Sequence, residues 1–96
     1  LLLGLVFFFP LAHANKALAQ KNGCLGCHAT NVKLVGPSYQ EVAEKYANDP
    51  NAKNQLMESI VKGSVGKWGD LPMPAHPSLS KQDVTKLVDW ILKGAK

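Results

Sequence analysis

The sequence predicts an all-α protein built from about four short helices. Apolar residues recur at the three- and four-residue spacing of a helix face in two segments, 52–62 and 80–93. At two points a serine stands three residues before an acidic residue, which is typical of a helix N-terminus. No segment shows the apolar and polar alternation of a half-buried strand. The chain is therefore expected to be a set of helices joined by loops.

The first two helices are predicted from their N-terminal residues. Asn15 is the expected N-cap of a first short helix over Lys16–Asn22. Ser38 and Glu41 have the spacing of a capping box, in which each side chain bonds the backbone N–H of the other residue. This box predicts a second helix that runs to about Tyr46.

The third and fourth helices are predicted from periodicity and from the residues that end them. The third is expected over Ala52–Lys62 and ends at Gly63. The fourth is expected to begin at Ser80, with Asp83 in the first turn, and to stop at Gly94. Their apolar stripes consist of Ala52, Leu56 and Ile60 in the third helix and of Val84, Leu87, Val88 and Ile91 in the fourth.

The segment Cys24-Leu25-Gly26-Cys27-His28 has the C-x-x-C-H spacing of a c-type haem attachment site. Two thiols three positions apart can reach the two vinyl groups of one porphyrin, and the next residue then places an imidazole under the iron. We therefore predict one covalent haem c, attached through Cys24 and Cys27, with His28 as the first axial ligand.

Three other chemistries use a C-x-x-C pair. A thioredoxin-like redox pair normally opens a helix within a βαβ pattern, which this sequence lacks. A structural zinc site takes four ligands, whereas the chain has two cysteines and the three histidines His13, His28 and His76. A disulfide between Cys24 and Cys27 would close a very short loop with little entropic benefit. Haem attachment is favoured because it also explains the adjacent histidine.

The first residues have the pattern of an export signal. Residues 1–14 form an apolar run that ends in Ala12-His13-Ala14, the small-x-small form of a signal-peptidase site. The run is too short to span a bilayer and is followed at once by polar residues, which argues against a membrane anchor. We expect a signal peptide, truncated at its start and cleaved after Ala14, and a single periplasmic domain over residues 15–96.

The composition of that domain limits its function. All 11 lysines and all 7 acidic residues follow residue 14, and there is no arginine. The net charge of +4 is moderate and scattered, so nucleic-acid binding is not indicated. We expect a monomer without stable membrane insertion, in which haem stabilises a core that is small for independent folding.

The loop Gly63–Leu79 is the expected source of a second iron ligand. It is rich in glycine and proline, and loops of this length in small domains are usually functional. Met73 lies between two prolines, which stiffen its backbone and hold its thioether in place. Met57 instead lies on the apolar face of the third helix, where a gap-filling role is favoured. His76 is the rival distal ligand, although a loop position near the haem edge is favoured for it.

Together these motifs resemble the small bacterial class I cytochromes c of the c551/c552 type. The resemblance covers essentially all of residues 15–96 and implies the class I cytochrome c fold, with about four short helices wrapped around one covalently attached haem. It rests on C-x-x-C-H, Val35-Gly36-Pro37, Lys67-Trp68-Gly69-Asp70-Leu71-Pro72-Met73-Pro74 and Asp89-Trp90-Ile91-Leu92, in that order.

The resemblance also implies roles for individual residues. His28 is then the proximal and Met73 the distal ligand, Pro37 accepts the ring N–H of the ligand histidine, and Trp68 donates to a haem propionate. The family often has a basic residue on the third helix where this chain has Ser59. That propionate contact is then either lost or moved to Lys62 or Lys67.

These expectations lead to a periplasmic single-haem electron carrier that cycles between Fe(II) and Fe(III) with His/Met ligation, and not to an enzyme. Six-coordinate iron has no open position for a substrate. The alternative is a haem peroxidase or gas-binding sensor, which needs a labile sixth site. Expected partners are redox proteins such as a cytochrome bc complex, a nitrite reductase, a terminal oxidase or a periplasmic dehydrogenase, steered by lysines about the haem edge.

Overall fold

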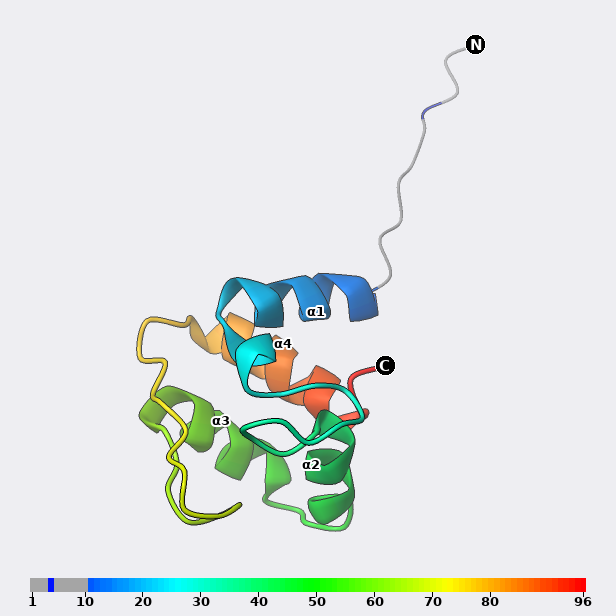
Figure 1. Ribbon diagram of the computed structural model, residues 1–96. Coiled ribbons are helices and arrows are strands. Elements are labelled where there is room, and N and C mark those ends of the chain that lie inside the picture. Colours follow the sequence, from blue (N-terminus) through cyan, green and yellow to red (C-terminus); the bar gives the residue numbers. More distant parts are fainter. Residues whose placement is uncertain (1–3, 5–10) are drawn as a thin grey trace.

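The computed structural model describes residue 4 and residues 11–96, and every regular element in this part is helical (Figure 1). In the same residues, β-type pairing is limited to two isolated bridges, one between His28 and Lys33 and one between Ser64 and Met73. The predicted all-α class is confirmed. The elements are α1 (Leu11–Lys21), the short 3₁₀ helix η1 (Cys24–Gly26), α2 (Tyr39–Lys45), α3 (Ala52–Lys62) and α4 (Lys81–Leu92).

Helix α4 is the centre of the fold. It packs against α1, α2 and α3, and in Figure 1 it crosses between α1 above and the other two helices below. Each large apolar side chain that it buries contributes about 1.5–3 kcal/mol to folding relative to an exposed one. Its buried residues are Val84, Leu87, Val88, Trp90 and Ile91, which include the whole predicted stripe.

The predicted helix starts at the two serines are confirmed. Ser38 accepts a hydrogen bond from Glu41 N over 3.1 Å, and Ser38 N donates to Glu41 Oε2 over 2.8 Å, so both halves of the capping box form. Ser80 accepts from Asp83 N over 3.1 Å at the start of α4. Helix α3 has the predicted bounds Ala52–Lys62. These starts and stops were predictable because they depend on residues close together in the sequence.

The predicted start of the first helix is wrong. Helix α1 begins at Leu11, so Asn15 lies inside it and not at its cap. Leucine and alanine are strong helix formers and extend the helix upstream of Asn15. The predicted signal peptide falls largely on residues 1–3 and 5–10, which lie outside the described residues, and its predicted cleavage point after Ala14 falls within α1. No helix of the described chain is long and apolar enough to cross a membrane.

Replacing Ser38 by alanine is expected to destabilise the protein more than the same change at Ser80. The Ser38 hydroxyl belongs to a reciprocal pair of bonds, and the residue is 2% exposed, whereas Ser80 is exposed and makes one cap bond. We expect Ser38→Ala to lower the free energy of unfolding by about 1–2 kcal/mol and Ser80→Ala by about 0.5–1 kcal/mol. Guanidinium unfolding of the two holoproteins measures this, and equal losses would contradict the ranking.

Candidate functional site

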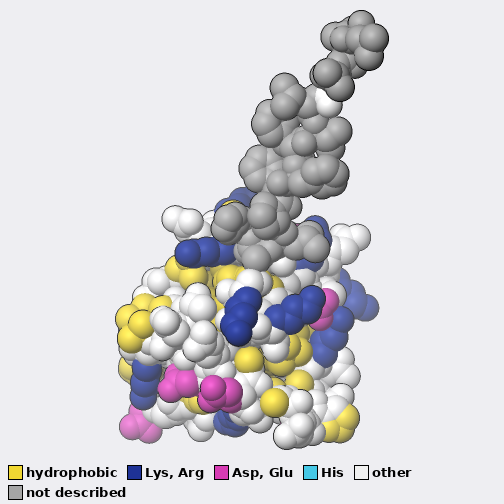
Figure 2. Space-filling view, turned by 90° about the vertical axis from the view of Figure 1, so that its right-hand side faces the viewer, with side chains coloured by type: hydrophobic (Ala, Val, Ile, Leu, Met, Phe, Trp, Pro, Cys, Tyr) yellow, Lys and Arg dark blue, Asp and Glu magenta, His cyan; other side chains and the backbone are white. Residues whose placement is uncertain are grey.

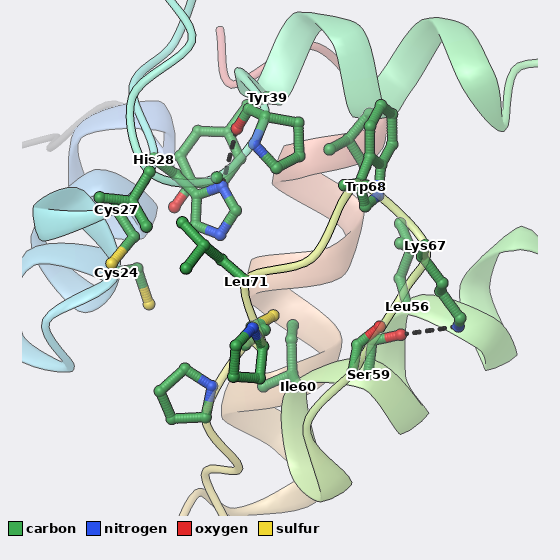
Figure 3. A pocket seen from close by; sticks show the side chains of 18 of the residues that line it. Cys24, Cys27, His28, Tyr39, Leu56, Ser59, Ile60, Lys67, Trp68 and Leu71 are labelled. Atoms are coloured by element: carbon green, nitrogen blue, oxygen red, sulfur yellow. Dashed lines mark hydrogen bonds between the residues drawn. The ribbon is translucent and has the colours of Figure 1, made fainter.

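A cavity of about 450 Å³ lies between the loop that follows η1, the inner faces of α2, α3 and α4, and the loop that joins α3 to α4 (Figure 3). Its size falls in the range of about 300–1,000 Å³ that is usual for cofactor pockets. Much of its wall is formed by Val42, Tyr46, Leu56, Ile60, Leu87 and Ile91. The interior of this small domain is therefore arranged around a space and not around side chains alone.

Two free thiols lie on one wall of the cavity. Cys24 and Cys27 both line it, and they are not joined in a disulfide. Burial raises the pKa of the Cys24 thiol above its ordinary value. The turn before them depends on Gly23, whose φ of 75° lies in the left-handed region that favours glycine. The C-x-x-C pair is thus presented to the cavity as two separate sulfur atoms.

The imidazole of His28 is held in one tautomer. Its Nδ1 lies 2.7 Å from the carbonyl oxygen of Pro37. Because a carbonyl only accepts, Nδ1 must carry the proton, and Nε2 keeps its lone pair. A hydrogen bond of this kind orients a metal-binding histidine and raises its basicity. His28 and Pro37, two residues singled out in the sequence, are therefore brought together.

Gly36 makes room for that imidazole. A Cβ built on Gly36 would lie 2.6 Å from His28 Cε1 and 2.9 Å from His28 Nδ1, closer than real side chains approach. Gly36 N also donates to the carbonyl of Cys27 over 2.8 Å, which folds the loop back beside the thiols. The glycine is required because the histidine ring occupies the place of its missing side chain.

Tyr39 is a site residue that the sequence reasoning missed. It is 3% exposed, lines the cavity, and stacks on His28 with 5.2 Å between ring centroids and 21° between the planes. Its other neighbour is Trp90 of α4, at 5.1 Å. Burial, with smaller contributions from the two cysteines, raises the pKa of Tyr39 far above its ordinary value, so its hydroxyl stays neutral. Its position directly after the predicted N-cap Ser38 was the available sequence indication.

Met73 lines the cavity from the α3–α4 loop, whereas Met57 is not part of the wall. The backbone of Met73 is paired with Ser64: Ser64 N donates to Met73 O over 3.1 Å and Met73 N to Ser64 O over 2.8 Å. These bonds fix the proline-flanked segment to the residues that follow α3. The thioether predicted from the sequence is thus held at the cavity by its backbone.

His76 lies farther along the same loop and also lines the cavity. Its backbone N donates to Ile60 O of α3 over 2.8 Å. Its ring Nδ1 is buried and has no hydrogen-bond partner among the residues that the structure describes. The loop is therefore fastened on both sides of Ala75, through Met73 to Ser64 just after α3 and through His76 to Ile60 within α3.

Trp68 lies in the first half of that loop and contacts a lysine of α2. The indole lines the cavity and remains 39% exposed, and Lys45 Nζ of α2 lies 4.3 Å from its ring centroid. Such cation–π contacts contribute about 0.5–1 kcal/mol at exposed sites. Lys45 also donates to the carbonyl of Lys67 over 3.3 Å. No sequence pattern indicated this lysine, because the contact joins segments about twenty residues apart.

An apolar cavity with two free thiols, an imidazole that retains its Nε2 lone pair and a thioether matches the chemistry of haem. The walls suit a flat porphyrin, the thiols suit thioether bonds, and nitrogen and sulfur suit iron. The fold and the cavity thus define a protein of the class that attaches haem covalently.

Comparison with known proteins gives the family. The cytochrome c family model matches residues 12–95, so this chain belongs to the cytochrome c family. Cytochrome c-551 of Allochromatium vinosum is 43% identical over 83 residues, which cover 86% of this chain and 88% of that protein. Cytochrome c-552 of Hydrogenobacter thermophilus is 39% identical over 92 residues, which cover 96% of this chain and 93% of that protein.

Solved structures agree with this assignment. The crystal structure of Nitrosomonas europaea cytochrome c552 matches with a TM-score of 0.79 and 42% identity, over 82% of this chain and 98% of that one. The class 1 cytochrome MtoD from Sideroxydans lithotrophicus matches with a TM-score of 0.73 and 31% identity, over 88% and 96%. The chain is a small bacterial class I cytochrome c of the c551/c552 type, a haem-containing electron carrier with one covalent haem c.

Alanine substitutions at two glycines of the α3–α4 loop compare the effect of backbone strain alone with that of strain and a clash with Met73. Gly63 and Gly66 have φ of 81° and 82°, so alanine at either site costs about 1–3 kcal/mol of backbone strain. A Cβ at Gly63 would also lie 2.7 Å from Met73 O, whereas a Cβ at Gly66 meets no atom within 4 Å. We expect Gly63→Ala to lower the free energy of unfolding by at least about 1 kcal/mol more than Gly66→Ala, because it also breaks the pairing with Ser64. Denaturant unfolding tests this, and equal losses would show that the Met73 contact is unimportant.

Proposed function

We propose that this protein is a periplasmic electron carrier in which His28 and Met73 are the two axial ligands of a single haem iron. The observation that carries the proposal is that His28, with its Nε2 lone pair free, and Met73 line one cavity from two separate loops. Cys24 and Cys27, on the same wall as His28, are the proposed attachment points. When bound, the haem supplies an iron that accepts and releases one electron.

The residues around the cavity would tune that exchange. The bond from His28 Nδ1 to Pro37 O makes the imidazole a stronger donor. A thioether ligand and an apolar wall both favour the reduced iron, because it carries less charge. The fixed backbone of Met73 limits rearrangement between the two oxidation states. Small rearrangement is what a fast electron carrier needs.

Two ligands from the protein would also exclude catalysis at the iron. A peroxidase or gas sensor requires a coordination position that a small molecule can occupy. In this proposal Met73 holds that position. The loop that carries it is fastened by bonds to Ser64 and Ile60, so opening it would break several backbone hydrogen bonds.

The surface near the cavity supports docking of redox partners by charge and apolar contact. Lys33 and Lys67 line the cavity, and Leu34, Val35 and Leu71 are exposed apolar residues of its wall. Figure 2 shows one face of the molecule, on which lysines are spread widely and acidic residues lie mainly toward the lower left. A positive rim around an apolar patch suits an acidic partner, and such attraction mainly speeds the encounter. The proposed partners remain redox proteins of the kinds named above.

Replacing Met73 by leucine is the direct test of ligation. Met73→Leu should remove the weak near-infrared band of a methionine–Fe(III) bond and should allow added imidazole or cyanide to bind the iron. Met57→Leu is the matched control, because Met57 lies on α3 outside the cavity wall, and it should keep the parent spectrum. Persistence of the band in Met73→Leu would contradict the proposal. A bis-histidine spectrum in the parent protein would point to His76 instead.

Export is tested by the N-terminus of the mature protein. When the natural precursor is expressed in a Gram-negative host that matures c-type haem, we expect the coloured protein in the periplasmic fraction with Asn15 as its first residue. Intact mass after osmotic shock measures both points. Blocking the proposed site with Ala14→Leu should leave the precursor uncut. Recovery of a cytoplasmic protein, or of an Ala14→Leu protein that still begins at Asn15, would refute the cleavage site.

A further inference from the structure

The imidazole of His28 is contacted from two separate segments. In the loop before α2, Pro37 O accepts from its Nδ1 over 2.7 Å, and Gly36 lies so close that a Cβ would clash with the ring. From α2, the Tyr39 ring lies nearly parallel to the imidazole, with 5.2 Å between ring centroids and 21° between the planes (Figure 3). A hydrogen bond tolerates a broad range of angles at its acceptor, so it fixes one ring atom better than the ring plane. The stacked tyrosine restricts the plane.

Tyr39 is itself held in place. Its backbone N donates to Ala29 O over 2.9 Å, which ties the start of α2 to the residue that follows His28. Trp90 of α4 contacts the tyrosine ring at 5.1 Å with a 59° tilt, and both aromatic residues are 3% exposed. The tyrosine ring is therefore fixed relative to His28 by a backbone hydrogen bond and by the packing of the core.

Tyr46 offers a comparison within the same chain. It follows α2 directly, is 5% exposed and lines the same cavity as Tyr39. Both tyrosines fill the core, but among the described residues Tyr39 stacks on His28 and Tyr46 does not. An effect on the site that Tyr39 has and Tyr46 lacks is therefore an effect exerted through the imidazole.

We propose that Tyr39 is a positioning residue that holds the plane of the His28 imidazole, through its ring and not through its hydroxyl. The inference rests on the proposed role of His28 as an axial ligand. When bound, haem supplies an iron whose affinity for the electron depends on how strongly the imidazole donates. The bond to Pro37 strengthens that donation only while Nδ1 faces the carbonyl. Tyr39 keeps Nδ1 in that direction, because a rotated imidazole would lose the stacking contact.

Loss of the stacked ring should loosen the imidazole in three measurable ways. The Nδ1 proton of His28 should exchange with solvent about two- to tenfold faster, the factor that corresponds to one aromatic pair. The spread of the haem methyl resonances in the Fe(III) protein should change, because it depends on the plane of the axial imidazole. The reduction potential should rise, because a weaker donor stabilises Fe(III) less.

The test compares three variants with the parent as holoproteins, by proton nuclear magnetic resonance and by potentiometric titration. Tyr39→Leu should show all three changes. Tyr39→Phe keeps the ring and should follow the parent. Tyr46→Leu is the matched control, because it removes a similarly buried tyrosine from the same cavity, and it should keep the exchange rate and the methyl pattern of the parent. Since either leucine admits more water to the cavity, the potentials of the two leucine variants are compared, and that of Tyr39→Leu should be the higher.

Failure of this inference is distinguishable from failure of the carrier function. If the parent has bound haem and a methionine–iron band, and Tyr39→Leu matches Tyr46→Leu in all three measurements, the positioning role is refuted while the carrier function stands. A Tyr39→Phe protein that behaves like Tyr39→Leu would overturn the assignment to the ring. If the parent binds no haem, both proposals fail. If Tyr39→Leu does not fold, nuclear Overhauser contacts between the rings of Tyr39 and His28 in the Fe(II) parent support the role, and their absence refutes it.

Discussion

The hydrogen bond between His28 Nδ1 and Pro37 O is the interaction on which the arrangement of the site depends. It joins His28, the last residue of the C-x-x-C-H motif, to Pro37, which directly precedes the N-cap of α2. Gly36 lies in between and cannot carry a side chain, because the imidazole fills that space. Tyr39, the first residue of α2, stacks on the same ring and also contacts Trp90 of α4. The orientation of one imidazole is thus built into the packing of two helices.

The two sides of the cavity are held by different forces. The His28 side combines the loop reversal, a buried hydrogen bond and aromatic stacking. The Met73 side is a loop held mainly by backbone hydrogen bonds to Ser64 and Ile60, at the end of α3. Backbone bonds fix where the loop lies but leave its side chains free to differ. Changes of sequence in this loop therefore alter the far side of the cavity without disturbing the orientation of His28.

The features that could be predicted from the sequence are those set by residues close together in the chain. The Ser38–Glu41 box, the bounds of α3 and the spacing of the C-x-x-C-H motif are of this kind. The start of α1 was missed because residues 11–14 were interpreted as the end of a signal peptide, although leucine and alanine are good helix formers. The contacts of Lys45 with Trp68 and of Lys67 with Ser59 join different elements. Neither residue carries a pattern that distinguishes it from a solvated lysine.

The position of a charged side chain also matters in a cavity that is mainly apolar. An apolar wall disfavours the oxidised iron because that state carries one more positive charge. Lys67 lies at one corner of this cavity, where its ammonium donates to the neutral hydroxyl of Ser59 and keeps its charge. A carboxylate in the place of Ser59 would instead pair with the ammonium and cancel that charge. The serine therefore leaves one positive charge at the edge of a mainly apolar cavity.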